Sequence, residues 1–195
     1  MRTPQVLQVL IASTRPGRQG ASVGAWTLAQ ATAFGKFDVE LVDLAEVNLP
    51  LLDEPRHPRF AQYEHEHTKR WSAIVDRADA YVFVTPEYDH GPPASLITAL
   101  QYLNREWAYK PVSFVSYGGV SGGTRAVNAI KIVVASLKMV PVFEAVSIPF
   151  FAQFVETESG AFDPGELQAK AAAVMLAELH RWSGALASLR TPATP

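Results

Sequence analysis

Three short apolar runs, each followed at once by a polar or glycine-rich loop, constrain the fold of this chain most strongly. The runs are Val6–Ile11, Ala80–Thr85 and Val112–Val115, and turn residues bound each of them. Runs this short and compact are typical of buried strands. Segments with helical spacing lie between them, and the alternation of buried strands with helices predicts a parallel sheet covered by helices on both faces.

The other expected elements continue this alternation. Helices are predicted over 21–34, 60–78, 94–107, 124–137 and 164–189, and further strands over 39–44 and 140–148, the last interrupted at Pro141. Three prolines predict a loop over 49–59. Five strands alternating with five helices predict an α/β three-layer sandwich with the flavodoxin-like strand order 2-1-3-4-5. Residues 1–190 are expected to form one domain, and 191–195 a disordered tail.

Composition narrows the classes of function. The 195 residues are 48% hydrophobic and carry a net charge of −2, which gives no general attraction to nucleic acid or to an anionic membrane. There is no cysteine, so thiolate catalysis, disulfides and cysteine metal sites are excluded, and a cytoplasmic location is expected. The apolar start of the chain is short and broken by Gln8, which favours a buried strand over a signal peptide.

The first loop has the chemistry of an anion site. Ser13, Thr14, Arg15 and Arg18 lie between a strand and a helix that begins near Ala21. Free N–H groups and the positive end of the helix dipole favour a dianion there, and Arg15 adds a charge-assisted contact. The loop lacks the G-x-G-x-x-G and P-loop patterns. The alternative is a solvated turn that carries arginines.

The other two loops suit a flat ring. Tyr88, in Pro86-Glu87-Tyr88-Asp89-His90-Gly91, is expected beside an aromatic ligand. The segment Ser116-Tyr117-Gly118-Gly119-Val120-Ser121-Gly122-Gly123 has four glycines in eight residues, which permit close approach of the backbone. Each loop alone is also compatible with an ordinary turn. Because loops at the carboxyl ends of parallel strands converge, the three together predict a phosphorylated, ring-bearing cofactor.

Together the three loops resemble those of the NAD(P)H-dependent FMN reductase family of flavodoxin-like proteins, over about Val6 to Val142. The resemblance implies FMN, with its phosphate in the first loop and its isoalloxazine ring between the other two. It also implies hydride transfer from NADPH or NADH to a quinone, flavin, azo compound or other small acceptor, and a homodimer or dimer of dimers. The cofactor-binding residues that it implies are Ser13, Arg15, Arg18, Gln19, Gly20, Pro86, Glu87, Tyr88, Asp89, Ser116, Tyr117, Gly118, Gly119 and Ser121.

The chain departs from the family pattern at three points. Ala12 stands where glycine is customary, and Asp89 stands where asparagine is usual. An ionised Asp89 beside the ring would repel the anionic reduced flavin and lower its potential. The stretch Leu96-Ile97-Thr98-Ala99-Leu100 lacks the usual lysine and asparagine of that helix. Its apolar residues lie on nearly every side, so the predicted dimer is built around 94–107, with Ile97 and Tyr102 turned outward.

Other interpretations stay open or are weaker. The chemistry is assigned to FMN rather than to a catalytic side chain, and Tyr88, His90 and Tyr117 are expected on the nicotinamide side. The alternative function is a flavin-binding electron carrier that does not oxidise NAD(P)H, and a protein that kept the fold and lost the flavin is a third. No metal site is predicted at His65-Glu66-His67, because residues i and i+2 point to different sides of a helix.

Overall fold

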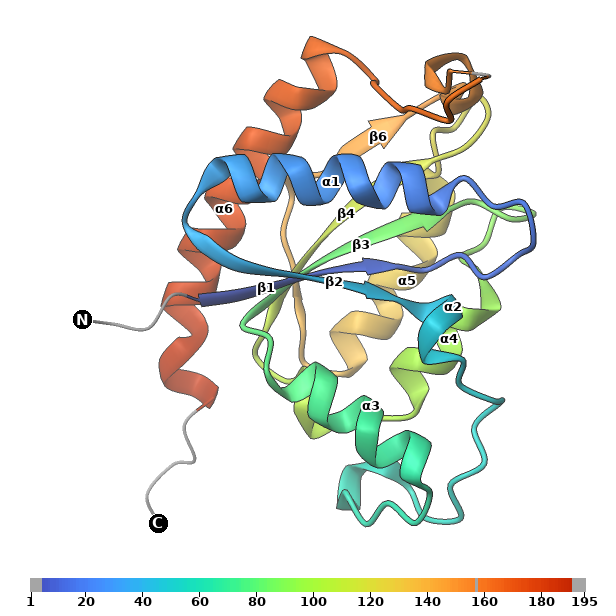
Figure 1. Cartoon of the computed structure of the whole chain (residues 1–195). Coiled ribbons are helices and arrows are strands. Elements are labelled where there is room, and N and C mark those ends of the chain that lie inside the picture. Colours follow the sequence, from blue (N-terminus) through green and yellow to red (C-terminus); the bar gives the residue numbers. More distant parts are fainter. Residues whose placement is uncertain (1–4, 157, 191–195) are drawn as a thin grey trace.

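The centre of the molecule is a parallel β-sheet with the strand order β2-β1-β3-β4-β5, in which β6 also pairs with β4 (Figure 1). The computed structural model describes residues 5–156 and 158–190. The strands are β1 (Gln5–Ile11), β2 (Phe37–Asp43), β3 (Ala80–Pro86), β4 (Pro111–Tyr117), β5 (Val140–Pro141) and β6 (Val146–Ile148). The flavodoxin-like fold and strand order predicted from the sequence are therefore confirmed.

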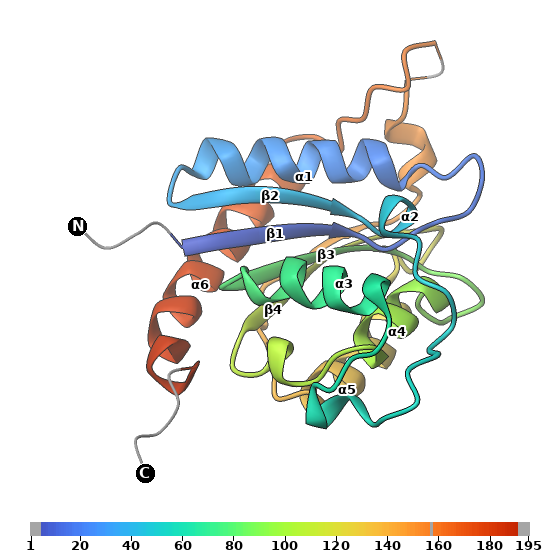
Figure 2. The ribbon, with the colours of Figure 1, turned by 60° about the horizontal axis from the view of Figure 1, so that its bottom comes forward.

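Helices cover both faces of this sheet. They are α1 (Gly20–Phe34), α2 (Leu44–Val47), α3 (Glu66–Asp76), α4 (Ala94–Gln101), α5 (Thr124–Ser136) and α6 (Glu166–Arg190). Helices α1 and α6 lie on one face, and α3, α4 and α5 lie on the other (Figures 1 and 2). Because both faces are covered, every residue of β3 and β4 is buried.

Each face has its own apolar core. On one side, the indole rings of Trp71 and Trp107 pack edge to face, 5.9 Å apart between centroids, against Phe83 of β3. On the other side, Val23 of α1 and Leu179 of α6 pack against the sheet. The sheet is thus held rigidly at its centre, and the loops at its carboxyl edge start from fixed points.

Two helices are shorter than the sequence predicted. The helix expected over 60–78 begins only at Glu66, because the carboxylate of Glu54 accepts the backbone N–H groups of Glu64 (2.9 Å) and His65 (3.0 Å) and holds that segment out of the helix. The helix expected over 94–107 ends at Gln101 and is followed by a 3₁₀ turn over Arg105–Trp107. Such capping contacts between distant residues leave no periodic signal.

The last predicted strand is divided in two. The sequence predicted one edge strand over 140–148 interrupted at Pro141. The chain instead pairs at β5, leaves the sheet after Val142, whose N–H still donates to the carbonyl of Val112 at 2.9 Å, and pairs again at β6. Phe143 in the intervening segment is almost fully exposed. Helix α2 was not predicted, because four residues are too few for a periodic pattern; Asp43 caps it through the N–H of Ala45 (2.9 Å). The predicted tail over 191–195 lies outside the described residues.

Candidate functional site

The first loop, residues 12–19, joins the carboxyl end of β1 to α1 at the right-hand side of Figure 1. Within the described residues, the N–H groups of Ser13, Thr14 and Arg15 have no protein acceptor. Gln19 is the N-cap residue of α1 and its side chain makes no capping hydrogen bond, so the N–H groups of the first helical turn are also open. Backbone donors at a helix N-terminus suit a phosphate group.

Gly20, the first residue of α1, lies directly over a buried hydroxyl pair. The Tyr117 hydroxyl donates to Oγ of Ser13 at 3.3 Å, and a Cβ atom at position 20 would lie 2.1 Å from that Oγ. Only glycine therefore lets the helix begin this close to the loop. Burial raises the pKa of Tyr117 to about 12, and its ring packs 5.0 Å from that of Phe151. The expectation that Tyr117 lines an open nicotinamide side is wrong, because its side chain belongs to the core beneath the loop.

The two arginines of this loop have different environments. Arg18 donates from one terminal nitrogen to Asp43 at 2.6 Å, and its other terminal nitrogen, which is buried, has no partner among the described residues. Arg15 is exposed, and its side chain makes no hydrogen bond or ion pair within the described part of the chain. Arg15 is therefore available in full to an anion, whereas Arg18 is already held by a carboxylate.

The second loop closes as a two-residue turn beyond β3. Tyr88 and Gly91 exchange two backbone hydrogen bonds of 2.9 and 2.8 Å, and Asp89 and His90 between them have φ values of 48° and 68°. Positive φ at both central residues defines a type I′ turn. Pro86 before it is buried as the last residue of β3. The turn places Tyr88, Asp89 and His90 at the surface, with the Asp89 carboxylate unpaired among the described residues.

Glu87 joins the second loop to the third. Its carboxylate accepts from Oγ of Ser121 (2.8 Å), from the backbone N–H of Arg125 (3.1 Å) and forms an ion pair with Nε of Arg125 (2.8 Å). These contacts hold the pKa of Glu87 below its usual value, although burial acts in the opposite direction. A carboxylate occupied in this way is not free for a cofactor, which leaves the backbone of Glu87 as its contribution to the site.

Arg125 is a site residue that the sequence analysis missed. Besides its bonds to Glu87, it donates from a terminal nitrogen to Nε2 of His90 at 2.8 Å. It is the second residue of α5 and follows a glycine-rich loop, and nothing in that local pattern distinguishes it from an ordinary surface arginine.

The third loop presents open backbone toward the same edge. Ser116 is buried, and its hydroxyl donates to the carbonyl of Gly122 at 2.8 Å. Gly123 has a φ of 83°, which a side chain would strain, and this residue turns the chain into α5. Within the described residues, the N–H groups of Gly119, Val120 and Ser121 have no protein acceptor. Gly118, by contrast, donates to the carbonyl of Ile148 at 3.3 Å.

A cavity of about 410 Å³ lies beneath the first loop, between α2 and α4. No charged side chain lines it; the lining residues are Thr14, Leu44, Ala45, Asn48, Leu49, Leu51, Ala94, Ser95 and Thr98. Ser95 fixes α4 to the loop by donating its hydroxyl to the carbonyl of Ala12 at 2.5 Å. The contribution of 44–51 was not predicted, because these residues were interpreted as a strand end and a surface loop.

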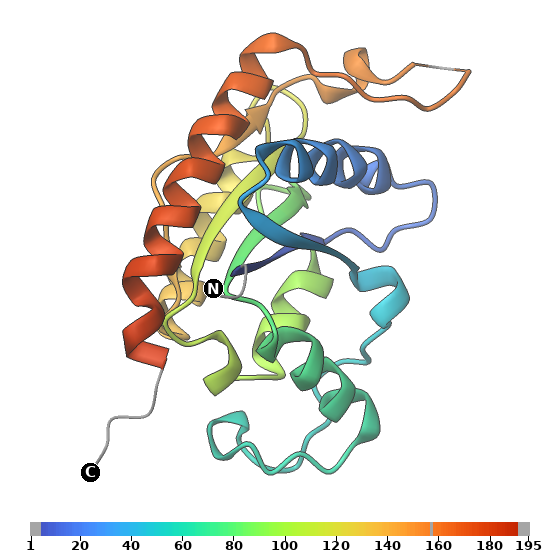
Figure 3. The ribbon, with the colours of Figure 1, turned by 60° about the vertical axis from the view of Figure 1, so that its left-hand side comes forward.

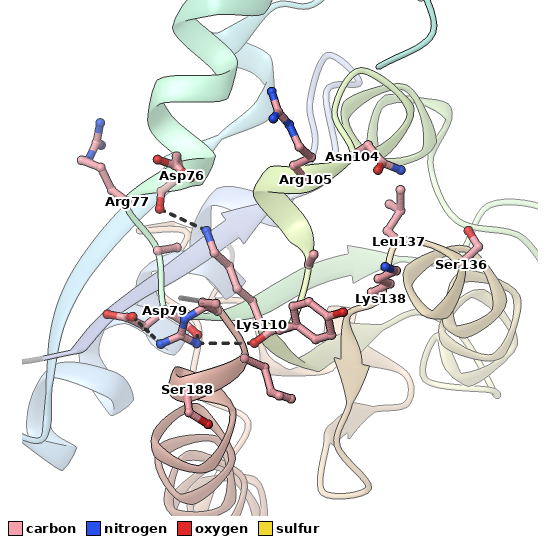
Figure 4. Close-up of a pocket in the computed structure, with 15 residues that line it drawn as sticks. Asp76, Arg77, Asp79, Asn104, Arg105, Lys110, Ser136, Leu137, Lys138 and Ser188 are labelled. Atoms are coloured by element: carbon pink, nitrogen blue, oxygen red, sulfur yellow. Dashed lines mark hydrogen bonds and ion pairs between the residues drawn. The ribbon is translucent and has the colours of Figure 1, made fainter. Parts of the chain in front are cut away.

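A larger cavity, of about 790 Å³, lies at the opposite, amino-terminal edge of the sheet (Figure 4). Lys110 donates there to the carbonyls of Val75 (2.9 Å) and Asp76 (3.1 Å) at the end of α3, and Arg190 at the end of α6 pairs with Asp79 (2.7 Å). Cations at helix C-termini satisfy open carbonyls and complement the helix dipole. These side chains therefore have a structural explanation, and the cavity is remote from the three loops.

His65 and His67, at the start of α3, lie differently from what the sequence predicted. His65 precedes α3 instead of lying within it, so its ring stacks on that of His67 at 5.1 Å between centroids, and the argument that the two point apart was wrong. His67 Nε2 lies 2.9 Å from Oδ1 of Asp53. No group of three or more candidate ligands among the described residues could hold a metal ion.

In the part of the chain that the structure describes, no helix is both long and apolar enough to cross a membrane.

The donors of the first and third loops fit FMN: unpaired N–H groups and Arg15 for a phosphate, and open backbone for a ring edge. The family model for NADPH-dependent FMN reductase matches residues 6–153. The chain belongs to this family. FMN is accordingly its cofactor and NAD(P)H its hydride donor, and the protein is an oxidoreductase.

Relatives of this FMN reductase family member include proteins named for more than one acceptor. It is 40% identical over 151 residues to an NAD(P)H-dependent FMN reductase of Schizosaccharomyces pombe, covering 75% of this chain and 74% of the relative. It is 32% identical over 99 residues to a quinone reductase of Pseudomonas putida, about half of each chain (48% and 50%). The solved structure of FerB, a flavoenzyme NAD(P)H:(acceptor) oxidoreductase from Paracoccus denitrificans, has a TM-score of 0.72 at 19% sequence identity. The match covers 93% of this chain and 98% of FerB, and this likeness shows the fold alone.

Proposed function

We propose that this chain transfers reducing equivalents from NAD(P)H to a small quinone or a related aromatic acceptor, such as a free flavin or an azo compound. The observation that carries this proposal is the convergence of three loops with unpaired backbone donors at the carboxyl edge of one sheet. The quinone reductase among the relatives supports the acceptor class. Bound FMN supplies the chemistry, by accepting a hydride from NAD(P)H and releasing it to the second substrate.

In this proposal the first loop holds the FMN phosphate. Arg15 supplies the charge-assisted contact, and the N–H groups of Ser13, Thr14 and the first turn of α1 supply further donors. Gln19 and Gly20 contribute backbone N–H groups, and the absence of a side chain at Gly20 lets α1 begin close to Ser13 and Tyr117. Arg18 contributes its unpartnered nitrogen while Asp43 fixes its orientation.

The second and third loops orient the ring. The backbone of Pro86–Asp89 lies along one edge, and that of Ser116–Ser121 along another. Glu87 and Arg125 keep the two loops at a fixed separation, so the ring enters a slot whose width is set before it binds. Tyr88 and His90, both exposed, line the side from which nicotinamide and acceptor reach the flavin. No acid–base side chain is assigned.

Three wider proposals accompany this one. Residues 1–190 act as a single FMN-binding domain. The protein works in the cytoplasm, which agrees with the absence of cysteine.

The third of these proposals is that the protein forms a homodimer around α4 that closes the mouth of the flavin crevice. Most apolar residues of α4 are used within the protomer. Tyr102, directly after α4, is also buried, so its predicted outward orientation is wrong. On α4 itself, half-buried Ile97 and the small exposed Ala94 remain as apolar contacts for a partner.

The visible spectrum of the purified protein, before and after anaerobic addition of NADPH or NADH, tests the function. A flavin absorbance that bleaches, and that returns when a quinone is added, is the expected result. A bound flavin that stays oxidised with both nucleotides would indicate an electron carrier. A colourless protein that binds no added FMN would overturn both functions.

A further inference from the structure

The outward side of α6 carries a stripe of large apolar side chains. Leu167 is 76% exposed, Val174 55%, Trp182 41% and Leu189 53%. At 3.6 residues per turn these four lie within an arc of about 80°. The side of α6 that packs on the sheet is a different one, formed by Ala172, Met175, Leu176, Leu179, Ser183 and Leu186. The orange-to-red helix in Figure 3 lies at the periphery of the molecule, along its whole length.

This stripe runs straight along the helix. With Ala171, Glu178 and Ala185, its residues follow one another at intervals of 4, 3, 4, 4, 3 and 4. These intervals make two 11-residue repeats, or about 3.67 residues per turn, which is close to the period of a straight α-helix. The stripe therefore does not wind around α6, and a second straight helix can touch it over about 33 Å, from Leu167 to Leu189.

The stripe is also symmetric about Glu178. Leu167 and Leu189 each lie 11 residues from it, and Val174 and Trp182 each lie four residues from it. A two-fold axis at Glu178 would place Leu167 opposite the partner's Leu189, and Val174 opposite the partner's Trp182. Self-complementarity of this kind is what an interface between two identical copies requires, and a partner of different sequence has no use for it.

The charges at the centre suit the same arrangement. Glu178 forms an ion pair with Arg181, which lies one turn further along the helix and is mostly exposed. In an antiparallel pair, the partner's Arg181 reaches Glu178 from the other side, so each carboxylate lies between two guanidinium groups. One polar position within an apolar seam also fixes the register of two helices. We infer that α6 is a contact face between two copies of this chain, packed antiparallel about Glu178.

Sedimentation velocity on the FMN-loaded protein tests this contact. Val174→Glu places a charge in the stripe and is expected to halve the mass of the wild-type assembly. Ala173→Glu is the matched control, because Ala173 is also exposed but lies about 100° away around the helix, and it should leave the mass unchanged. Retained FMN absorbance shows that both variants fold. A wild-type mass of 21.3 kDa at all concentrations up to about 100 µM, or an unchanged mass for Val174→Glu, would overturn the inference.

Cross-linking tests the antiparallel register independently. The natural chain has no cysteine, so a single introduced thiol is unique. Glu178→Cys brings two thiols together at the axis and is expected to give a covalent dimer with a short bis-maleimide. Ala173→Cys, away from the stripe, should give little covalent dimer. Equal yields from the two variants would show that α6 does not pair about Glu178.

Discussion

Nε of Arg125 lies 2.8 Å from Oε1 of Glu87, and this ion pair ties the turn after β3 to the first residues of α5. The side chain of Glu87 is only 7% exposed, whereas that of Arg125 is about half exposed. The pair therefore fixes two of the three candidate flavin loops relative to each other without contributing its carboxylate to the ligand.

Arg125→Met should weaken FMN binding about three- to tenfold, because the loops lose one tie while Ser121 still donates to Glu87. Titration of the apo-protein with FMN measures the change. Arg77→Met is the control, since Arg77 pairs with Glu40 far from the loops. Equal affinities for the two variants would mean that the pair does not hold the flavin slot.

Arg15→Ala should weaken FMN binding at least about tenfold and leave the fold intact, since the Arg15 side chain makes no hydrogen bond or ion pair within the described protein. Arg18→Met removes one contact to the phosphate as well, and it should in addition lower thermal stability, because it leaves the carboxylate of Asp43 without its cation. Comparison of affinity with melting temperature separates these two roles. An FMN affinity that survives Arg15→Ala would remove this residue from the phosphate site.

Asp89→Asn should raise the midpoint potential of bound FMN, because it removes a negative charge that disfavours the anionic reduced flavin. The backbone should not change, since asparagine accepts the φ of 48° at this position. The potentials of both proteins are compared at fixed pH. Asp38→Asn, at the start of β2 and away from the loops, should have no effect. A potential that falls or stays constant in Asp89→Asn would place this carboxylate away from the ring.

Lys110 should make stability depend on pH in the alkaline range. Burial lowers its pKa to about 8 from the ordinary 10.5, so between these values the unfolded chain binds more protons than the folded one. The free energy of unfolding should therefore rise with pH from 8 to 10.5, by about 2–3 kcal/mol more in the wild type than in Lys110→Met. Urea unfolding across this range measures the difference, with exposed Lys138→Met as the control. Parallel curves for wild type and Lys110→Met would contradict the assignment.

Ile97→Glu should separate the proposed dimer at α4 and reduce NAD(P)H oxidation more than it reduces thermal stability. The residue is half-buried against its own core, so part of any loss of stability is internal. Ile97→Ala provides the reference for that part, because it removes the same packing without adding a charge. If both variants keep the wild-type mass and lose activity equally, α4 does not form the dimer.

A feature of the structure could be predicted from the sequence where the residues that determine it follow one another in the chain. The strand order and the positions of the three loops were predictable, because each short apolar run and each glycine-rich turn consists of consecutive residues. The environment of Tyr117 was not, since its burial depends on Ser13 and Phe151, which lie on other elements. Arg125 was not predicted for the same reason: its role in the site depends on its contacts with Glu87, which lies 38 residues earlier in the chain. The early end of α4 likewise reflects a distant arrangement around Glu106 and Tyr63.

The break between β5 and β6 has a consequence for how copies of this protein can meet. A long, continuous outer strand would offer a row of open amides, on which another molecule could extend the sheet. Here that border consists of two pieces of two and three residues, one of them ending in a proline without an amide hydrogen. Growth of the sheet across this border is blocked at its first step. Association on this flank is therefore left to side chains rather than to backbone hydrogen bonds.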